Sequence, residues 1–260
     1  NTFQKIKNEN RTALLTYTVG GDPNADISLE IFKSIANSGA DIIECGLGHG
    51  ANIGDGGAIQ DSTYRALSNG IKTDDVFKII KDFKKEFEQN IIIMTYQNKI
   101  MSYGEENFIK KCNESSVSGI ICVDWPWPLN LDFANKCKAS DLTFIQLLCP
   151  TTSDDRLKSI LSDAHDVVYY ISMLSTTGQK LKVGSDEIIK KFNQIKSIAP
   201  EKKCIIGFGI TQDTISDFKG TDACVVGSEL CRNITSSIND GQNPATKIGQ
   251  IVNDLKERLS

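Results

Sequence analysis

The chain has 260 residues, of which 40% are hydrophobic, and this is ample for a buried core in one large α/β domain or two small ones. Its formal net charge is -4 and its pI is about 5.3, with lysines scattered among acidic residues, so the composition argues against a nucleic-acid partner. No apolar stretch approaches the roughly 18 residues that span a bilayer, and residues 1–10 are polar and charged rather than signal-like, so we expect a soluble protein with no membrane partner.

Short β-branched runs alternate with longer amphipathic stretches from one end of the chain to the other, which is typical of repeated βα units. We predict eight strands, over residues 14–19, 40–45, 91–95, 118–124, 143–148, 167–172, 204–207 and 223–226. Helical segments between and after them include residues 27–38, 75–87, 105–112, 185–197 and 245–259. Many of these segments open on Asp, Ser or Thr, as helix N-caps do.

The strand at 118–124 contains the unbroken apolar run Gly119-Ile120-Ile121-Cys122-Val123, which fits a parallel strand covered on both faces. Eight such units in 260 residues predict a (β/α)8 TIM barrel, with one domain over residues 1–260 and an extra N-terminal helix. An open doubly wound sheet is the alternative, because periodicity does not define strand order.

Two candidate loops are long in a chain that is otherwise tightly connected. The loop over residues 46–57 is half glycine, and the second covers residues 174–184. Both would lie at the C-terminal mouth of a barrel, where active sites are built, and one of them could close as a lid.

The eight cysteines include no C-x-x-C pair, and several lie inside apolar runs. We therefore expect reduced core residues in a cytoplasmic protein rather than a set of disulfides.

Three carboxylates occupy places where a barrel would present them at its mouth. Glu44 closes the apolar strand Asp41-Ile42-Ile43-Glu44-Cys45, where partial burial would raise its pKa and suit it to acid and base work. A structural, salt-bridged glutamate is the alternative. Asp55 lies among glycines, as a second carboxylate of the site or as a turn former, and Asp124 repeats the strand-end pattern or only braces its loop.

The chain has only two histidines, so a His-rich metal site is excluded and we expect no metal. His49, in the glycine-rich loop, could touch a ligand or be solvated, and His165 is predicted to lie on the surface. Walker A, GxGxxG after the first strand, and HExxH patterns are absent from the sequence.

Two glycine signatures near the C-terminus predict a phosphate site. Gly207-Phe208-Gly209 ends one strand, and Gly227-Ser228 ends the next. Glycine lets the backbone approach an anion, and a helix N-terminus can point its free N–H groups at it, as the last two βα loops of a barrel commonly do.

The ordered set of motifs resembles the alpha subunit of tryptophan synthase over essentially the whole chain. The matching segments are Thr18-Val19-Gly20-Gly21-Asp22-Pro23, Gly39-Ala40-Asp41-Ile42-Ile43-Glu44-Cys45-Gly46, Asp55-Gly56 with Ile59-Gln60, Met94-Thr95-Tyr96-Gln97-Asn98, Val123-Asp124-Trp125-Pro126, Cys149-Pro150, Tyr169-Tyr170, Thr177-Gly178, Gly207-Phe208-Gly209-Ile210 and Gly227-Ser228.

The resemblance implies retro-aldol cleavage of indole-3-glycerol phosphate to indole and glyceraldehyde 3-phosphate, with indole passed to a beta subunit in an alpha2-beta2 complex. It implies Glu44 as general acid/base and Asp55 as the acceptor of the indole N–H. Breaking the bond at indole C3 needs one proton shuttle and one counter-charge, so this division of labour is chemically sound. No cofactor is implied for this chain, since pyridoxal phosphate would belong to the beta partner.

The resemblance also implies the binding positions. Phosphate would be held at Gly178, Gly207, Gly209, Gly227 and Ser228. Substrate would contact Tyr17, Met94, Tyr96, Ile121, Tyr170, Thr177 and Phe208, most of which would form an apolar slot for the indole, with Thr177 on a lid.

Two loops depart from the family. Where the family usually reads Pro-Phe-Ser-Asp-Pro, this chain has Gly48-His49-Gly50-Ala51-Asn52, and residues 172–178 look one residue short and lack the usual arginine. Two other functions therefore stay open: a catalytically weakened barrel that binds and activates a beta subunit, and a lyase or isomerase for another sugar phosphate.

Overall fold

The computed structural model describes residues 2–172, 174–176, 179–181, 184–207 and 209–260. Its main sheet is parallel throughout and runs in the order β5-β4-β3-β2-β1-β11-β10-β7-β6. The strands are β1 (Ala13–Val19), β2 (Ile42–Gly46), β3 (Asn90–Thr95), β4 (Gly119–Cys122), β5 (Thr143–Phe144), β6 (Gln146–Leu148), β7 (Val167–Ile171), β10 (Lys203–Gly207) and β11 (Ala223–Val226).

The two ends of this sheet meet in one interrupted strand. Only Ile145 separates β5 from β6, and its backbone N–H donates to the carbonyl of Ile120 in β4 at 2.8 Å. The sheet therefore closes on itself, and β5 and β6 together are the fifth of the eight predicted strands. The TIM barrel is confirmed and the open doubly wound sheet is ruled out.

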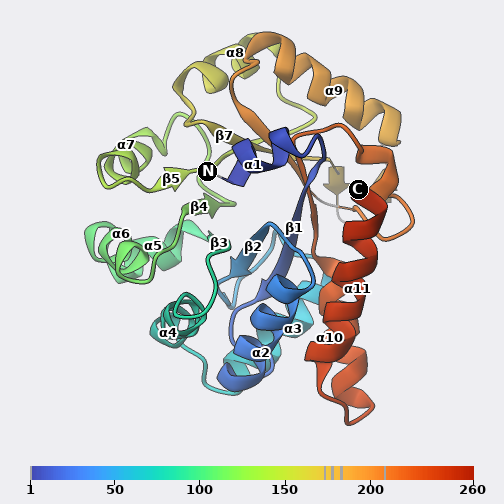
Figure 1. Ribbon diagram of the computed structural model, residues 1–260. Helices are drawn as coiled ribbons and strands as arrows, with labels where there is room; N and C mark the ends of the chain where they lie inside the picture. Colours follow the sequence, from blue (N-terminus) through green and yellow to red (C-terminus); the bar gives the residue numbers. More distant parts are fainter. Residues whose placement is uncertain (1, 173, 177–178, 182–183, 208) are drawn as a thin grey trace.

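Helices surround the strands, as Figure 1 shows. They are α1 (Thr2–Asn8), α2 (Ala25–Asn37), α3 (Gly57–Ser68), α4 (Thr73–Phe83), α5 (Gln97–Tyr103), α6 (Glu105–Glu114), α7 (Leu131–Ala139), α8 (Asp154–Asp163), α9 (Ser185–Ile198), α10 (Ser228–Asn239) and α11 (Pro244–Leu259), with a short 3₁₀ turn at Ile215–Phe218. Each of the five predicted helices is present within a few residues of its expected ends. The extra N-terminal helix is α1, whose Ile6 is buried in the interior of the barrel.

Side chains alternate between two cores because successive residues of a strand face opposite sides of a sheet. The outer core lies between strands and helices and includes Phe32, Phe77, Phe108 and Phe133. The inner core fills the barrel and contains Ala13, Leu15, Tyr17, Val19, Ile42, Ile92, Met94, Ile121, Ile145, Tyr169, Ile205, Ala223 and Val225. This alternation decides which strand residues can face a substrate at the mouth.

The second long loop has structure that its sequence did not predict. Within residues 174–184, β8 (Leu174–Thr176) and β9 (Gln179–Leu181) pair antiparallel as a separate two-stranded sheet. The expectation of a plain loop there is wrong.

All eight cysteines are free thiols, and seven of them are buried. Within the described residues, no helix is both long enough and apolar enough to cross a bilayer.

Candidate active site

Glu44 is a carboxyl group inside the barrel. In the sheet register it lies between Tyr17 of β1 and Ile92 of β3, and both of these residues belong to the inner core. The residue is 1% exposed, and its Oε2 has no hydrogen-bond partner among the described residues. Burial, together with the negative charge of Asp55, raises the pKa of Glu44 to about 8. Glu44 forms no salt bridge with any residue that the structure describes, so the structure does not support the salt-bridged alternative.

Asp55 lies in the loop after β2, two residues before α3 begins. Burial raises the pKa of this carboxyl group, while the nearby polar side chains of Asn52 and Tyr96 act in the opposite direction. Its Oδ1 is buried without a hydrogen-bond partner among the described residues. Because the charge of Asp55 is felt at Glu44, the two carboxyl groups belong to one electrostatic site.

Three of the predicted apolar slot residues come together in the inner core: Tyr17, Met94 and Ile121. Tyr96 is 4% exposed, and its hydroxyl accepts the backbone N–H of Gly54 at 3.1 Å. It therefore reaches from the end of β3 to the loop that carries Asp55.

The structure does not bring Tyr170 to this set. Tyr170 packs in the outer core, and its neighbour Tyr169 faces the interior, where burial and, to a smaller extent, the charge of Glu44 raise the pKa of the phenol. Tyr169, rather than Tyr170, therefore faces the interior, because neighbouring residues of a strand point to opposite faces of the sheet.

Two glycines make room for the interior tyrosines. A Cβ on Gly46 would collide with the ring of Tyr17, and a Cβ on Gly207 would collide with the ring of Tyr169. Gly207, predicted as a phosphate position, therefore also has a packing role within the barrel.

Four of the five predicted phosphate positions lie at or just after the ends of β10 and β11. Gly227 precedes α10 as its N-cap without a side-chain cap, and Ser228 is the first residue of this 12-residue helix. Gly209 has a φ of 77°, which favours glycine. The Glu229 carboxylate accepts the backbone N–H of Gln212 at 2.9 Å and so ties the loop after β10 to the first turn of α10. Thr177, Gly178 and Phe208 lie outside the described residues.

A cavity of about 440 Å³ opens on the β4, β6 and β7 side of the mouth. Its floor includes Val123, Leu147 and Ile171, which pack against the inner core. Its walls include Trp125 and Trp127, and the Arg156 guanidinium lies 5.2 Å from the centre of the Trp127 ring. This volume is in the range of small-molecule sites.

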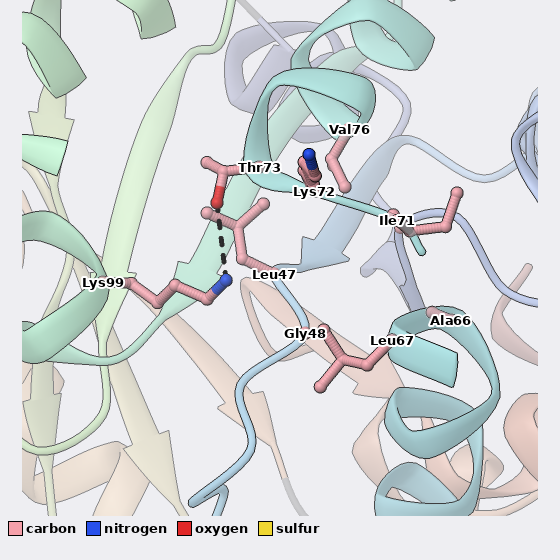
Figure 2. A pocket seen from close by; sticks show the side chains of 10 residues that line it. Leu47, Gly48, Ala66, Leu67, Ile71, Lys72, Thr73, Val76 and Lys99 are labelled. Carbon is pink, nitrogen blue, oxygen red and sulfur yellow. Dashed lines mark hydrogen bonds between the residues drawn. The ribbon is translucent and has the colours of Figure 1, made fainter. Parts of the chain in front are cut away.

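A second hollow lies outside the barrel, between the loop after β2 and the helices α3 to α5. Figure 2 shows Leu47, Leu67 and Val76 around it, with the Lys99 ammonium 3.4 Å from the Thr73 hydroxyl. Its volume is about 10 Å³, which is room for about one water molecule. We assign it no ligand.

The other polar candidates are placed as follows. Asp124 accepts the backbone N–H of Gln97 at 2.7 Å, so it braces the start of α5. His49 is half-buried, and its ring centre lies 5.1 Å from that of Tyr96. His165 is also half-buried and accepts the backbone N–H of Phe144 at 3.0 Å, so the prediction of a surface histidine is wrong there.

Known proteins match this chain over the whole barrel. The family model described as tryptophan synthase alpha chain matches residues 3–260. The chain belongs to this family. The tryptophan synthase alpha chain of Pelagibacter ubique is 52% identical over 99% of this chain and 97% of the relative, and that of Methanocaldococcus jannaschii is 33% identical over 92% and 85%.

Solved structures of the tryptophan synthase alpha family have the same fold. Tryptophan synthase subunit alpha from Legionella pneumophila superposes with a TM-score of 0.89 at 26% identity, over 99% of this chain and 96% of the other. A structure of the tryptophan synthase a2b2 complex from Pyrococcus furiosus gives 0.81 at 28% identity, over 95% and 99%. The resemblance stated from the motifs is confirmed.

Sequence reasoning missed several residues that shape this alpha-chain site. Tyr169 was recoverable from strict alternation along β7, because Tyr170 and Val168 then both face outward. The contact of His49 with Tyr96 and the bond of Glu229 to Gln212 join segments far apart in sequence, so no local pattern indicates them.

Proposed function

We propose that this chain cleaves indole-3-glycerol phosphate to indole and glyceraldehyde 3-phosphate, with Glu44 as the general acid/base and Asp55 as the counter-charge. Lyases of the tryptophan synthase alpha family carry out this cleavage. The observation that carries the assignment is the Glu44 carboxyl group buried inside the barrel, where burial and the charge of Asp55 raise its pKa to about 8.

The raised pKa of Glu44 suits the first proton transfer. At neutral pH its carboxyl group holds a proton, which it gives to C3 of the indole ring. Positive charge then develops on the ring nitrogen, whose N–H donates to the carboxylate of Asp55. The free Glu44 carboxylate next takes the proton of the glycerol hydroxyl group, and the carbon–carbon bond at C3 breaks. Its electron pair restores the aromatic ring, so indole and an aldehyde leave and Glu44 is protonated again.

The remaining contacts position the substrate in this proposal. Tyr17, Met94 and Ile121 offer apolar surface to the indole, and Tyr169 takes the place first expected for Tyr170. Gly207, Gly209, Gly227, Ser228 and the free N–H groups of α10 would hold the phosphate, together with Gly178. Thr177 and Phe208 keep their predicted roles as proposals.

A beta subunit is the partner of this chain, as the family and the a2b2 complex from Pyrococcus furiosus support. We propose that the complex works in the cytoplasm, which the eight free cysteines favour because thiols stay reduced there.

The test is indole release from indole-3-glycerol phosphate by the purified chain, with and without a tryptophan synthase beta subunit. Glu44→Gln should lower turnover by about 100-fold or more, because the amide cannot carry the proton. Glu187→Gln makes the same chemical change at an exposed site on α9 and should leave turnover unchanged. Full turnover in Glu44→Gln would overturn the assigned role.

A barrel that only activates its partner would behave differently in the same assay. It would stimulate the beta subunit without releasing indole. We include this second function in the test because the loop after β2 is rich in glycine. Nothing lies within 4 Å of the position that a Cβ would occupy on Gly50, Gly56 or Gly57.

A further inference from the structure

The loop that carries Asp55 has few side chains to hold it. Residues 47–56, between β2 and α3, include four glycines, and glycine loses more conformational freedom on ordering than any other residue. Gly50, Gly56 and Gly57 have open space where a Cβ would stand, and Ile53 is 87% exposed. The order of this loop must therefore come from a small number of contacts.

Two of those contacts converge on Tyr96. The Tyr96 hydroxyl accepts the N–H of Gly54 at 3.1 Å, and the His49 ring lies 5.1 Å from the Tyr96 ring at an interplanar angle of 35°. Asp55 follows Gly54 directly, and its charge helps to raise the pKa of the Tyr96 phenol. His49, Tyr96 and the Gly54-Asp55 pair thus form a connected series of contacts.

Tyr96 is itself well anchored. It is 4% exposed and comes directly after β3, at the start of α5. His49, by contrast, lies between Gly48 and Gly50 and is half-buried. A ring packed on the Tyr96 ring restricts both partners, and aromatic pairs at this separation are stabilising.

We propose that His49 is a positioning residue, which holds Tyr96 and the loop in the arrangement that places Asp55 for reaction. The contact is between two rings tilted by 35°, so we assign the effect to the shape of the ring rather than to the imidazole proton. This inference rests on the proposed role of Asp55, and it assigns to His49 no contact with the substrate.

The variants His49→Ala and His49→Phe separate shape from chemistry. His49→Ala should lower the kcat for indole release by about tenfold and change KM by less than threefold, because the loop still closes over substrate but places Asp55 poorly. His49→Phe keeps a flat ring and should restore kcat to within about twofold of the original. Ala51→Ser changes an exposed residue of the same loop and serves as the control.

The coupling to Tyr96 has its own test. Tyr96→Phe removes the hydroxyl group that holds Gly54. If His49 acts by positioning that hydroxyl group, the double variant His49→Ala/Tyr96→Phe should have a kcat less than twofold below that of Tyr96→Phe alone. The losses of the two single variants would then not be additive. Full additivity of the two losses in kcat would overturn the proposal. An unchanged kcat in His49→Ala would also overturn it, as would a kcat in His49→Phe that stays as low as in His49→Ala.

A readout without substrate distinguishes this proposal from the proposed function. Limited proteolysis at residues 48–56 should be several-fold faster in His49→Ala than in the original chain and should return to the original rate in His49→Phe. If the original chain releases no indole but shows this pattern, the proposed function fails and the role of His49 in holding the loop stands. Equal proteolysis rates in all three chains would overturn that role.

Discussion

Arg65 of α3 binds Asp22 through two parallel hydrogen bonds, Nε to Oδ1 at 2.9 Å and Nη2 to Oδ2 at 2.8 Å. The Asp22 side chain is 0% exposed and that of Arg65 is 21% exposed. The same guanidinium donates to Ser62 in its own helix and to Thr235 in α10. It therefore joins the loop after β1 to the helix that follows Asp55 and to the helix that begins at Ser228.

Removal of this guanidinium should destabilise the fold strongly. Arg65→Ala leaves the Asp22 carboxylate buried without its cation, and we expect a loss of about 3 kcal/mol in the free energy of unfolding, measured by urea denaturation. Adding Asp22→Ala should recover part of the loss, because the unpaired charge is then gone. Lys33→Ala, which breaks the more exposed pair with Glu86, should cost less than about 1 kcal/mol. A similar cost for both single variants would contradict this account.

Stability should fall as the pH rises through the range in which Glu44 titrates. Its pKa is raised to about 8 in the folded chain and returns near its ordinary value of 4.5 on unfolding. Between these two pH values the folded state keeps a proton that the unfolded state has released. The contribution of Glu44 to stability is therefore fully present below pH about 4.5 and is lost progressively as the pH rises to about 8.

The matched variant for this pH effect is Glu44→Gln. Urea denaturation at several pH values should show the free energy of unfolding of the original chain falling relative to the variant by up to about 1.4 kcal/mol per pH unit. Burial also raises the pKa of Asp55, so the titration of Asp55 likewise lowers stability as the pH rises. Asp55 is present in both chains, so its effect is common to both. Parallel profiles for the two chains would show that Glu44 is not the titrating group.

Gly207→Ala tests the fit of the Tyr169 ring. The added methyl group meets the ring directly, and we expect destabilisation of about 1–3 kcal/mol from overpacking. Gly57→Ala, at the first residue of α3 with open space around it, should be neutral or slightly stabilising. Thermal unfolding of both variants is the measurement, and an unchanged melting temperature for Gly207→Ala would contradict the packing.

The beta subunit should bind at the rim of the mouth. Ile53, in the loop after β2, and Leu129, in the loop after β4, are 87% and 73% exposed, and loops after the strands share one end of the barrel. Ile53→Asp or Leu129→Asp should weaken binding of the beta subunit by about tenfold or more in titration calorimetry. Lys190→Glu on the exposed face of α9 should leave the affinity unchanged.

The strand positions were predictable because each strand is a compact apolar run between polar segments. The number of βα units favoured a closed barrel, but periodicity did not show which strands pair, and the break at Ile145 between β5 and β6 leaves no mark in the sequence. The hairpin of β8 and β9 was missed because its strands have three residues each, too few for an alternation to appear.

Within the candidate site, the order of motifs indicated Glu44 and Asp55, and the register explains why Glu44 faces inward. The choice between Tyr169 and Tyr170 needed the register, because two adjacent tyrosines fit the same motif and only one faces the interior. The Arg65–Asp22 pair spans 43 positions in the chain, so only the fold reveals it.

The walls of the 440 Å³ cavity have a practical consequence. The chain has two tryptophans, Trp125 and Trp127, and both line that cavity. Its intrinsic tryptophan emission therefore originates wholly at the mouth of the barrel, without background from the rest of the fold. The unmodified protein thus carries its own spectroscopic probe for the arrival of a small molecule or of a partner.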